Sequence, residues 1–416
     1  MVADGAQLIL VNNCNEGIWP GILGSAGQPT PKDGGFHLGS GEEVVLDVQE
    51  KWSGRIWGRQ GCNFDNNGKG SCITGDFISM AGSNGIKGGY WLSKQANIFP
   101  PERIPTSYFT HLFYAFVGVN ATNGKLIISK SQEIKNFMTK VHNGHKKALL
   151  SIGGPRSATE NPSNAICVMA NDHIKRATFI NSTIDEALRY GFDGLDLAWE
   201  FPETQVDMDN MATLFEEWRS RVDDRQAELL LTASVYFASE IPRGRQSITY
   251  PADSINLNLD FVNLILYDYT PTTGAHAQFH ANQAYTGSGD RGITSWSNAG
   301  VPANKLVMGI PFFGKKWTLL DENDNGIGAP VVSYDGVVPY NQIPGASNGT
   351  YDSSTISQYL AYETSWFGYD GKHSITEKIH ISKRGNLVGG YFVYALGDED
   401  SQGHTLSKAA SDAWDN

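Results

Sequence analysis

The stretch at residues 192–202, FDGLDLAWEFP, alternates carboxylates with apolar side chains. With a period of two, Asp196, Ala198 and Glu200 lie on one face of a strand, and bulky apolar residues lie on the other. This pattern is typical of a barrel wall that packs on outer helices and turns its acids inward near the carboxyl end of the strand. Desolvation there would raise the pKa of Glu200 and suit it to general acid catalysis. The alternative is a buried glutamate with a structural partner.

The same stretch resembles the DxxDxDxE signature of glycoside hydrolase family 18, in the wording of the plant class V chitinases. Asp193, Asp196 and Glu200 match this signature, and Ala198 stands in place of its third aspartate. The resemblance implies that the N-acetyl carbonyl of the sugar is the nucleophile. It also implies that a glutamic acid, here Glu200, protonates the leaving oxygen, and that the missing aspartate would hold the acetamide N–H. Asp193, Asp196, Glu200 and Tyr267 are therefore the expected catalytic residues.

Further site residues follow from the resemblance. Ser151 in LLSIGG matches a serine that hydrogen-bonds the inner aspartate, and Tyr267-Asp268 in LILYDY matches an acetamide-binding tyrosine and its neighbouring aspartate. Tyr394 stands where the family has a tryptophan at the floor of the sugar site. The aromatic candidates could equally be packing residues. The expected substrate-binding residues are Tyr90, Phe116, Ser151, Ala198, Asp268, Tyr394 and Trp366.

The elements that must position these residues alternate between strand-like and helical runs, which predicts an α/β fold with a TIM (β/α)8 barrel at 88–416. The stretch at about 315–378 is too long for one connection and resembles the small α+β insertion of the chitinase family. The eight expected strands lie at residues 88–93, 110–119, 147–154, 192–200, 228–237, 260–269, 305–314 and 387–396.

The first segment, residues 1–77, is rich in Gly, Asn and Trp and predicts a small all-β unit, followed by a flexible linker at 78–87. Its wording, including LILVNNCNEGIWPGIL, resembles the opening of a thaumatin-like protein, which here stops early. Cys62 and Cys72 match a local disulfide of that family, although free thiols remain an alternative. Missing strands would leave open sheet edges, so self-association through this segment is expected to be possible.

Composition limits the partners. A net charge of -12 argues against nucleic acid, and no apolar run reaches the roughly 18 residues that predict a membrane span. No metal-binding or cofactor motif is found, so no metal and no cofactor are expected. The N-terminus does not read as a signal peptide, which leaves a mature secreted form or a cytosolic protein open. We expect an extracellular or vacuolar protein, as the disulfide and the plant-defence wording indicate.

These observations favour a chitinase-like protein that binds chitin or N-acetylglucosamine oligosaccharides and whose hydrolysis is lost or strongly reduced. One alternative is an active family 18 hydrolase that uses Glu200 as general acid, with a non-standard substrate as one version. The other alternative is an interaction or defence scaffold.

Overall fold

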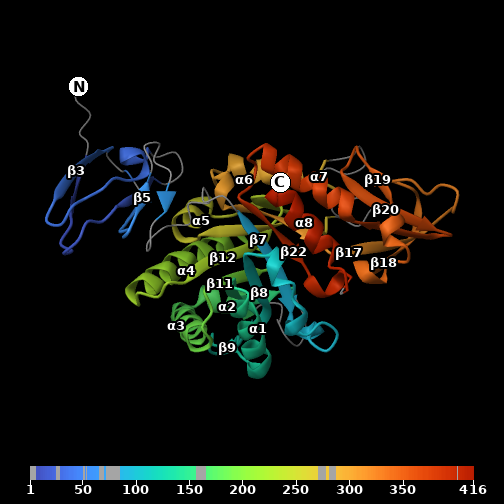
Figure 1. Ribbon diagram of the computed structural model, residues 1–416, viewed down its shortest axis with the longest axis horizontal. Helices are drawn as coiled ribbons and strands as arrows, with labels where there is room; N and C mark the ends of the chain where they lie inside the picture. Colours follow the sequence, from blue (N-terminus) through green and yellow to red (C-terminus); the bar gives the residue numbers. More distant parts are fainter. Residues whose placement is uncertain are drawn as a thin grey trace.

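The computed structural model of the 416-residue chain describes residues 6–24, 29–49, 52, 54–64, 70–71, 85–155, 165–269, 278–280, 287–400 and 402–416. Figure 1 shows small sheets near the N-terminus on the left, a central barrel wrapped by helices, and an antiparallel sheet on the right. In the described part of the chain, no helix is long and apolar enough to cross a membrane.

Eight parallel strands form the barrel. The sheet closes because the first strand pairs with both the last strand and the second, and the second strand pairs with the third. Seven expected strand runs contain one of them, and the first run, 88–93, overlaps a strand that begins at Ile86, so the predicted barrel is confirmed. A short antiparallel strand, β9 (Leu126–Ile127), extends β8. The barrel strands are β7 (Ile86–Leu92), β8 (His111–Val119), β10 (Lys147–Gly154), β11 (Gly194–Trp199), β12 (Leu230–Tyr236), β15 (Phe261–Ile265), β16 (Leu306–Pro311) and β22 (Gly390–Tyr394).

Helices surround this barrel, and α4 illustrates how they begin. The Thr204 hydroxyl accepts from the Asp207 N–H while the Asp207 carboxylate accepts from the Thr204 N–H, which is a capping box. A hairpin of β13 (Glu240–Arg243) and β14 (Gln246–Thr249) follows β12. The helices are α1 (Ser131–Asn143), α2 (Ala165–Asn171), α3 (His173–Tyr190), α4 (Gln205–Asp224), α5 (Ala252–Asn258), α6 (Gly289–Asn298), α7 (Lys372–Arg384) and α8 (Thr405–Asp415).

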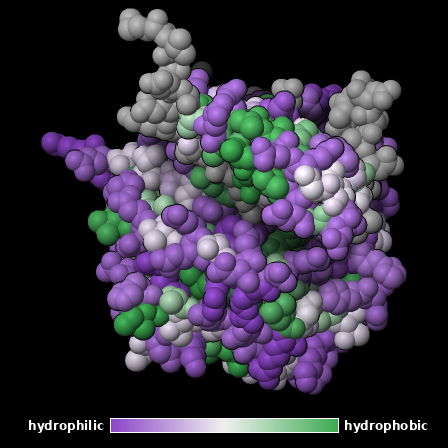
Figure 2. Space-filling view, turned by 90° about the vertical axis from the view of Figure 1, so that its left-hand side faces the viewer, coloured by the Kyte–Doolittle hydropathy of each residue, from purple (hydrophilic) through white to green (hydrophobic). Residues whose placement is uncertain are grey.

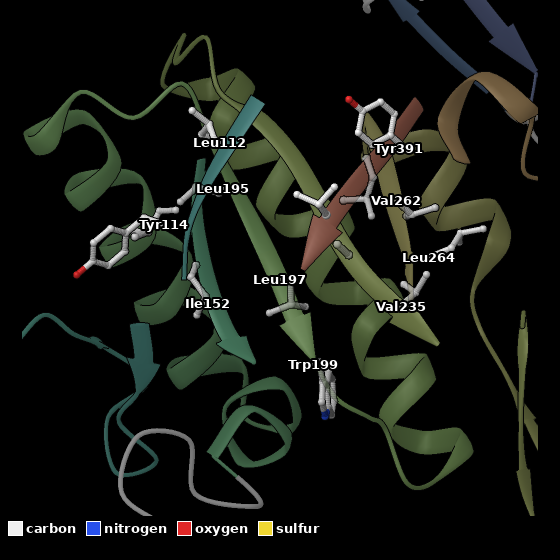
Figure 3. Packing of buried hydrophobic residues seen from close by; sticks show 14 of the residues in the cluster. Leu112, Tyr114, Ile152, Leu195, Leu197, Trp199, Val235, Val262, Leu264 and Tyr391 are labelled. Carbon is white, nitrogen blue, oxygen red and sulfur yellow. The ribbon is translucent and has the colours of Figure 1, made fainter. Parts of the chain in front are cut away.

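The outer face of the barrel strands carries the main core. On β11, Leu195, Leu197 and Trp199 belong to one buried cluster between strands and helices, as the alternation predicted (Figure 3). Their neighbours in the sequence therefore face the barrel interior. In the register with β10, Asp196 lies opposite Ser151, and Ala198 lies opposite Gly153.

The insertion is a five-stranded antiparallel sheet in the order β18-β17-β21-β20-β19. Its core contains Trp317 and Trp366, whose ring centroids lie 5.4 Å apart. Two short 3-10 turns lie between β18 and β19, and α7 begins at Lys372, after the last strand of the sheet. The strands are β17 (Phe313–Leu319), β18 (Val331–Pro339), β19 (Thr350–Asp352), β20 (Ser357–Tyr362) and β21 (Ser365–Tyr369).

Where the first segment is described, it forms three two-stranded sheets: β1 (Ala6–Val11) with β3 (Glu43–Val48), β2 (Gly21–Gly24) with β4 (Gly54–Trp57), and β5 (Asn63–Phe64) with β6 (Gly70–Ser71). Figure 2 views this side of the molecule and shows a group of hydrophobic side chains surrounded by hydrophilic ones.

The cysteines of the first segment are only partly described. Cys62 is disulfide-bonded, and Cys14 is free and exposed. Cys72 lies outside the described residues, as does most of the linker expected at 78–87. The Cys62–Cys72 pairing and the linker boundaries therefore stay predictions.

Candidate functional site

Glu200 directly follows β11, and it lines a cavity of about 100 Å³ at the barrel mouth. Its carboxyl group makes no hydrogen bond with any residue that the structure describes. Burial, and then the charges of Asp268 and Asp196, raise the pKa of Glu200 from 4.5 to about 8. At neutral pH the group therefore keeps its proton, as a general acid must. The cavity is lined by Pro155, Glu200, Phe201, Tyr236, Ile265, Tyr267, Asp268, Phe313 and Tyr394.

Asp196 lies deeper in the barrel and is fully buried. One of its oxygens accepts from the Ser151 hydroxyl at 2.6 Å and from the Tyr90 phenol at 2.9 Å, and the other accepts from Thr232 at 2.8 Å. Burial raises the pKa of Asp196 above its ordinary value, and the hydroxyl donors oppose this. The hydrogen bond expected between Ser151 and Asp196 is therefore present. Asp196 thus accepts from three donors, and none of them comes from position 198.

Tyr90 belongs to the support of Asp196 and does not line the cavity. Its side chain is 1% exposed, and its ring stacks on Phe113 at 4.4 Å. The phenol oxygen also lies 2.7 Å from the Ser234 hydroxyl and accepts from the Asn263 amide at 2.8 Å. The expectation that Tyr90 contacts substrate is wrong, because its inward-facing ring is enclosed by neighbouring strands below the mouth.

Ala198 is fully buried between Asp196 and Glu200 on the inner face of β11. Its register neighbours are Gly153 on β10 and Ser234 on β12. A methyl group neither donates nor accepts a hydrogen bond, so Ala198 offers Glu200 no hydrogen-bonding neighbour on its own strand. The position of the missing aspartate therefore lies on the same inner face as Glu200, two residues before it.

Aromatic rings surround the cavity. Tyr267 and Tyr394 stack with centroids 6.1 Å apart, and Phe116 lies 6.4 Å from Tyr394. Burial raises the pKa of both tyrosines, so both phenols keep their protons and can donate. Gly154 makes room for Phe116, because a Cβ there would lie 2.4 Å from its ring. Tyr267 and Tyr394 therefore line the same cavity as Glu200, whereas Phe116 packs beside Tyr394 and is not among the lining residues, so its contact with substrate stays a prediction.

Asp268 lies at the rim of the cavity and is exposed. Its carboxylate forms an ion pair with Lys315, a buried residue on β17. Lys315 was not among the predicted site residues. A basic pair, Lys315-Lys316, at the end of a predicted strand was the available signal.

Two expected site residues lie elsewhere. Asp193 precedes β11, and at about 3.3 Å per residue it is about 23 Å along the strand from Glu200. There it accepts from the Ala148 N–H at 2.8 Å and pairs with Lys147 at 3.0 Å, so its role is structural and not catalytic. Trp366 is 0% exposed and donates to the Asn325 carbonyl. Because both its faces are packed in the insertion core, it offers no surface to a sugar.

The polar interior of the barrel also contains Thr232, Ser234 and Asn263. None of these was among the predicted site residues. The signal was present, because Thr232 and Ser234 alternate with apolar residues on β12. No group of three or more metal-ligating side chains is found among the residues with described positions.

Comparison with known proteins agrees with this geometry. Residues 87–400 match the model for glycosyl hydrolases family 18, and residues 12–89 match the thaumatin family. The chain belongs to glycosyl hydrolase family 18. Its barrel is of the class V chitinase type, preceded by a thaumatin-family segment.

Several family 18 relatives are similar over most of their length. Nod factor hydrolase protein 1 of Medicago truncatula is 39% identical over 79% of this chain and 90% of its own. A mutant class V chitinase from Nicotiana tobaccum, solved in complex with NAG4, is 34% identical with a TM-score of 0.72, over 79% of this chain and 99% of that one. A chitinase-like agglutinin from Robinia pseudoacacia is 36% identical with a TM-score of 0.71 over the same shares.

Proposed function

We propose that the barrel mouth binds N-acetylglucosamine oligomers and that their hydrolysis is lost or strongly reduced. The observation that carries this proposal is the isolated carboxyl group of Glu200, beside which Ala198 provides no hydrogen-bonding group. Similar proteins solved in complex with GlcNAc oligomers support the choice of ligand.

The loss of chemistry follows from how the substrate would be held. In substrate-assisted hydrolysis the acetamide must be oriented toward the anomeric carbon, and its developing positive charge needs a nearby carboxylate. Asp196 cannot take over this task, because its oxygens already accept from three hydroxyl groups inside the barrel. Losing one preorganised electrostatic group typically lowers kcat by about 10²–10³.

Binding depends on groups that remain. The Tyr394 ring lines the cavity and supplies an apolar face for a pyranose ring, and the Tyr267 phenol supplies a donor. The protonated Glu200 can donate to a glycosidic oxygen without transferring its proton. Ligand recognition therefore does not require the missing aspartate.

The test is a calorimetric titration with the N-acetylglucosamine hexamer, followed by mass spectrometry of the same sample. We expect the hexamer to bind and to be recovered intact. Tyr394→Ala should weaken binding, whereas Tyr362→Ala, at an exposed tyrosine of the insertion sheet, should not. Rapid cleavage of the hexamer, or no binding at all, would contradict the proposal.

A second candidate is hydrolysis of an oligosaccharide that lacks the N-acetyl group. It is favoured by one observation, the pKa of about 8 that keeps Glu200 protonated at neutral pH. New reducing ends from glucose or glucosamine oligomers, absent in Glu200→Gln, would establish this activity. If the release persists in Glu200→Gln, it does not come from this site.

A further inference from the structure

A second cavity, of about 590 Å³, lies at the seam between the insertion sheet and helix α7. We call it the seam cavity and define it by Tyr351, Gln358, Lys372, His373, Thr376 and Glu377. It shares no lining residue with the cavity around Glu200. Its volume falls within the range of about 300–1,000 Å³ that is typical of small-molecule sites.

Two stacked rings form one wall of the seam cavity. The Tyr351 phenol ring and the His373 imidazole lie with centroids 4.0 Å apart and planes within 10° of each other. Tyr351 comes from β19 and His373 from the first turn of α7, so the stack joins the insertion to the barrel. His373 is exposed, and its outer ring face is a flat surface on which the C–H face of a sugar can pack.

Polar groups around these rings lack protein partners. Among the described residues, the Thr376 hydroxyl and the Tyr351 phenol make no hydrogen bond, and both side chains line the cavity. The Gln358 amide nitrogen donates to the Gly349 carbonyl at 3.0 Å, and its amide oxygen is enclosed by protein, so Gln358 is part of the wall and offers no free group. Each sugar hydroxyl both donates and accepts, so such a ligand could satisfy donors and acceptors together.

The charges at the seam cavity indicate a neutral ligand. Lys372 and Glu377 both line it, and neither forms an ion pair with a described residue. Their opposite charges offset each other within the lining. The nearby carboxylate of Asp352 acts on Tyr351 but does not line the cavity, and it accepts hydrogen bonds from Ser354 and Thr355. A flat ring face, mixed donors and acceptors and no net charge are the features that a neutral sugar matches.

We propose that the seam cavity is a second carbohydrate site, which binds a neutral oligosaccharide independently of the barrel mouth. Each chain would then carry two sugar sites on different parts of its surface, so that one chain could bridge two glycan strands. Bridging raises the apparent affinity for a multivalent surface above that of either site alone.

The experiment counts ligands by native mass spectrometry at saturating concentrations of the trimers of N-acetylglucosamine and of glucose, tested separately. For at least one of the two trimers, we expect the parent to bind one more copy per chain than Tyr351→Ala binds. Thr376→Arg, which fills the cavity from α7 and keeps both rings, should lose the same copy. Tyr362→Ala alters an exposed tyrosine on the same sheet, outside the cavity lining, and should match the parent.

The test distinguishes binding at the seam cavity from binding at the barrel mouth. Tyr394→Ala should lower occupancy of the mouth and leave the copy that depends on Tyr351. If the mouth binds nothing, the parent should hold one trimer and both seam variants none. The proposal is overturned if, for both trimers, the parent binds no copy that is lost in both Tyr351→Ala and Thr376→Arg.

Discussion

Glu200→Gln should stabilise the protein, and the gain should grow with pH. In the folded state the pKa of Glu200 is about 8, because burial opposes ionisation and Asp268 and Asp196 add to it. In the unfolded chain the ordinary value is 4.5. Between these two pH values the folded state holds a proton that the unfolded state has released, so the free energy of unfolding falls as pH rises.

The magnitude follows from the gap between the two pKa values. At about 1.36 kcal/mol per pKa unit, the gap from 4.5 to about 8 corresponds to about 5 kcal/mol above pH 8. This is an upper value, because the Glu200 carboxyl opens onto the cavity. Glutamine cannot ionise, so the variant escapes this destabilisation while keeping nearly the same shape.

The assay is urea unfolding of the parent and Glu200→Gln at pH values from 4 to 9. The difference in the free energy of unfolding should be near zero at the acid end, should increase between pH 4.5 and 8 and should then level off. Glu216→Gln, at an exposed glutamate on α4, is the matched control and should show no such increase. A difference that does not change with pH would refute the reasoning and with it the protonated state of Glu200.

Three further outcomes are expected. The double change Ala198→Asp with Tyr394→Trp should raise release of reducing ends from the hexamer by about 10²–10³, and an inert double variant that still binds would show that the loss lies elsewhere. Asp193→Ala should lower the free energy of unfolding by about 1–3 kcal/mol without changing glycan binding, because it leaves the partly buried Ala148 N–H without its acceptor. Burial acts to raise the pKa of Asp193, but the hydrogen bonds from Ala148, Lys147 and His142 hold it below its ordinary value, so its stabilising effect should fade as pH falls through that lowered pKa. Trp366→Ala should cost about 3–5 kcal/mol in urea unfolding, as loss of a fully buried tryptophan does, and a loss of binding at the barrel mouth without destabilisation would contradict its assignment to the core.

The barrel could be predicted from the sequence because period-two alternation fixes which side chains face inward. Along β11 and the residue after it, this rule predicts that Asp196, Ala198 and Glu200 share the inner face. The same rule argues against Asp193, which lies three residues before Asp196 and so has the opposite parity. The motif resemblance included Asp193 because a shared spacing does not distinguish a catalytic residue from one that holds the strand.

How deep a side chain lies below the barrel mouth, and how it packs, were harder to predict than which face of its strand it occupies. Tyr90 faces inward as expected, but alternation does not tell how far below the mouth an inward ring lies. Trp366 lies on a strand whose two faces both carry apolar residues, so no periodicity separated a sugar platform from a core residue. Lys315 reaches Asp268 from the insertion, across a connection whose path depends on tertiary structure.

The interior of the barrel explains how the fold can tolerate an alanine at position 198. If Asp196 depended on its neighbour for a hydrogen bond, Ala198 would leave a buried charge uncompensated and would cost several kcal/mol. Instead, three hydroxyl donors satisfy Asp196 from other strands, so the substitution isolates only Glu200. Glu200 adjusts by keeping its proton, which removes the charge rather than burying it. The chemistry and the fold are therefore separable at this position, and Ala198 can remove the first while the second is preserved.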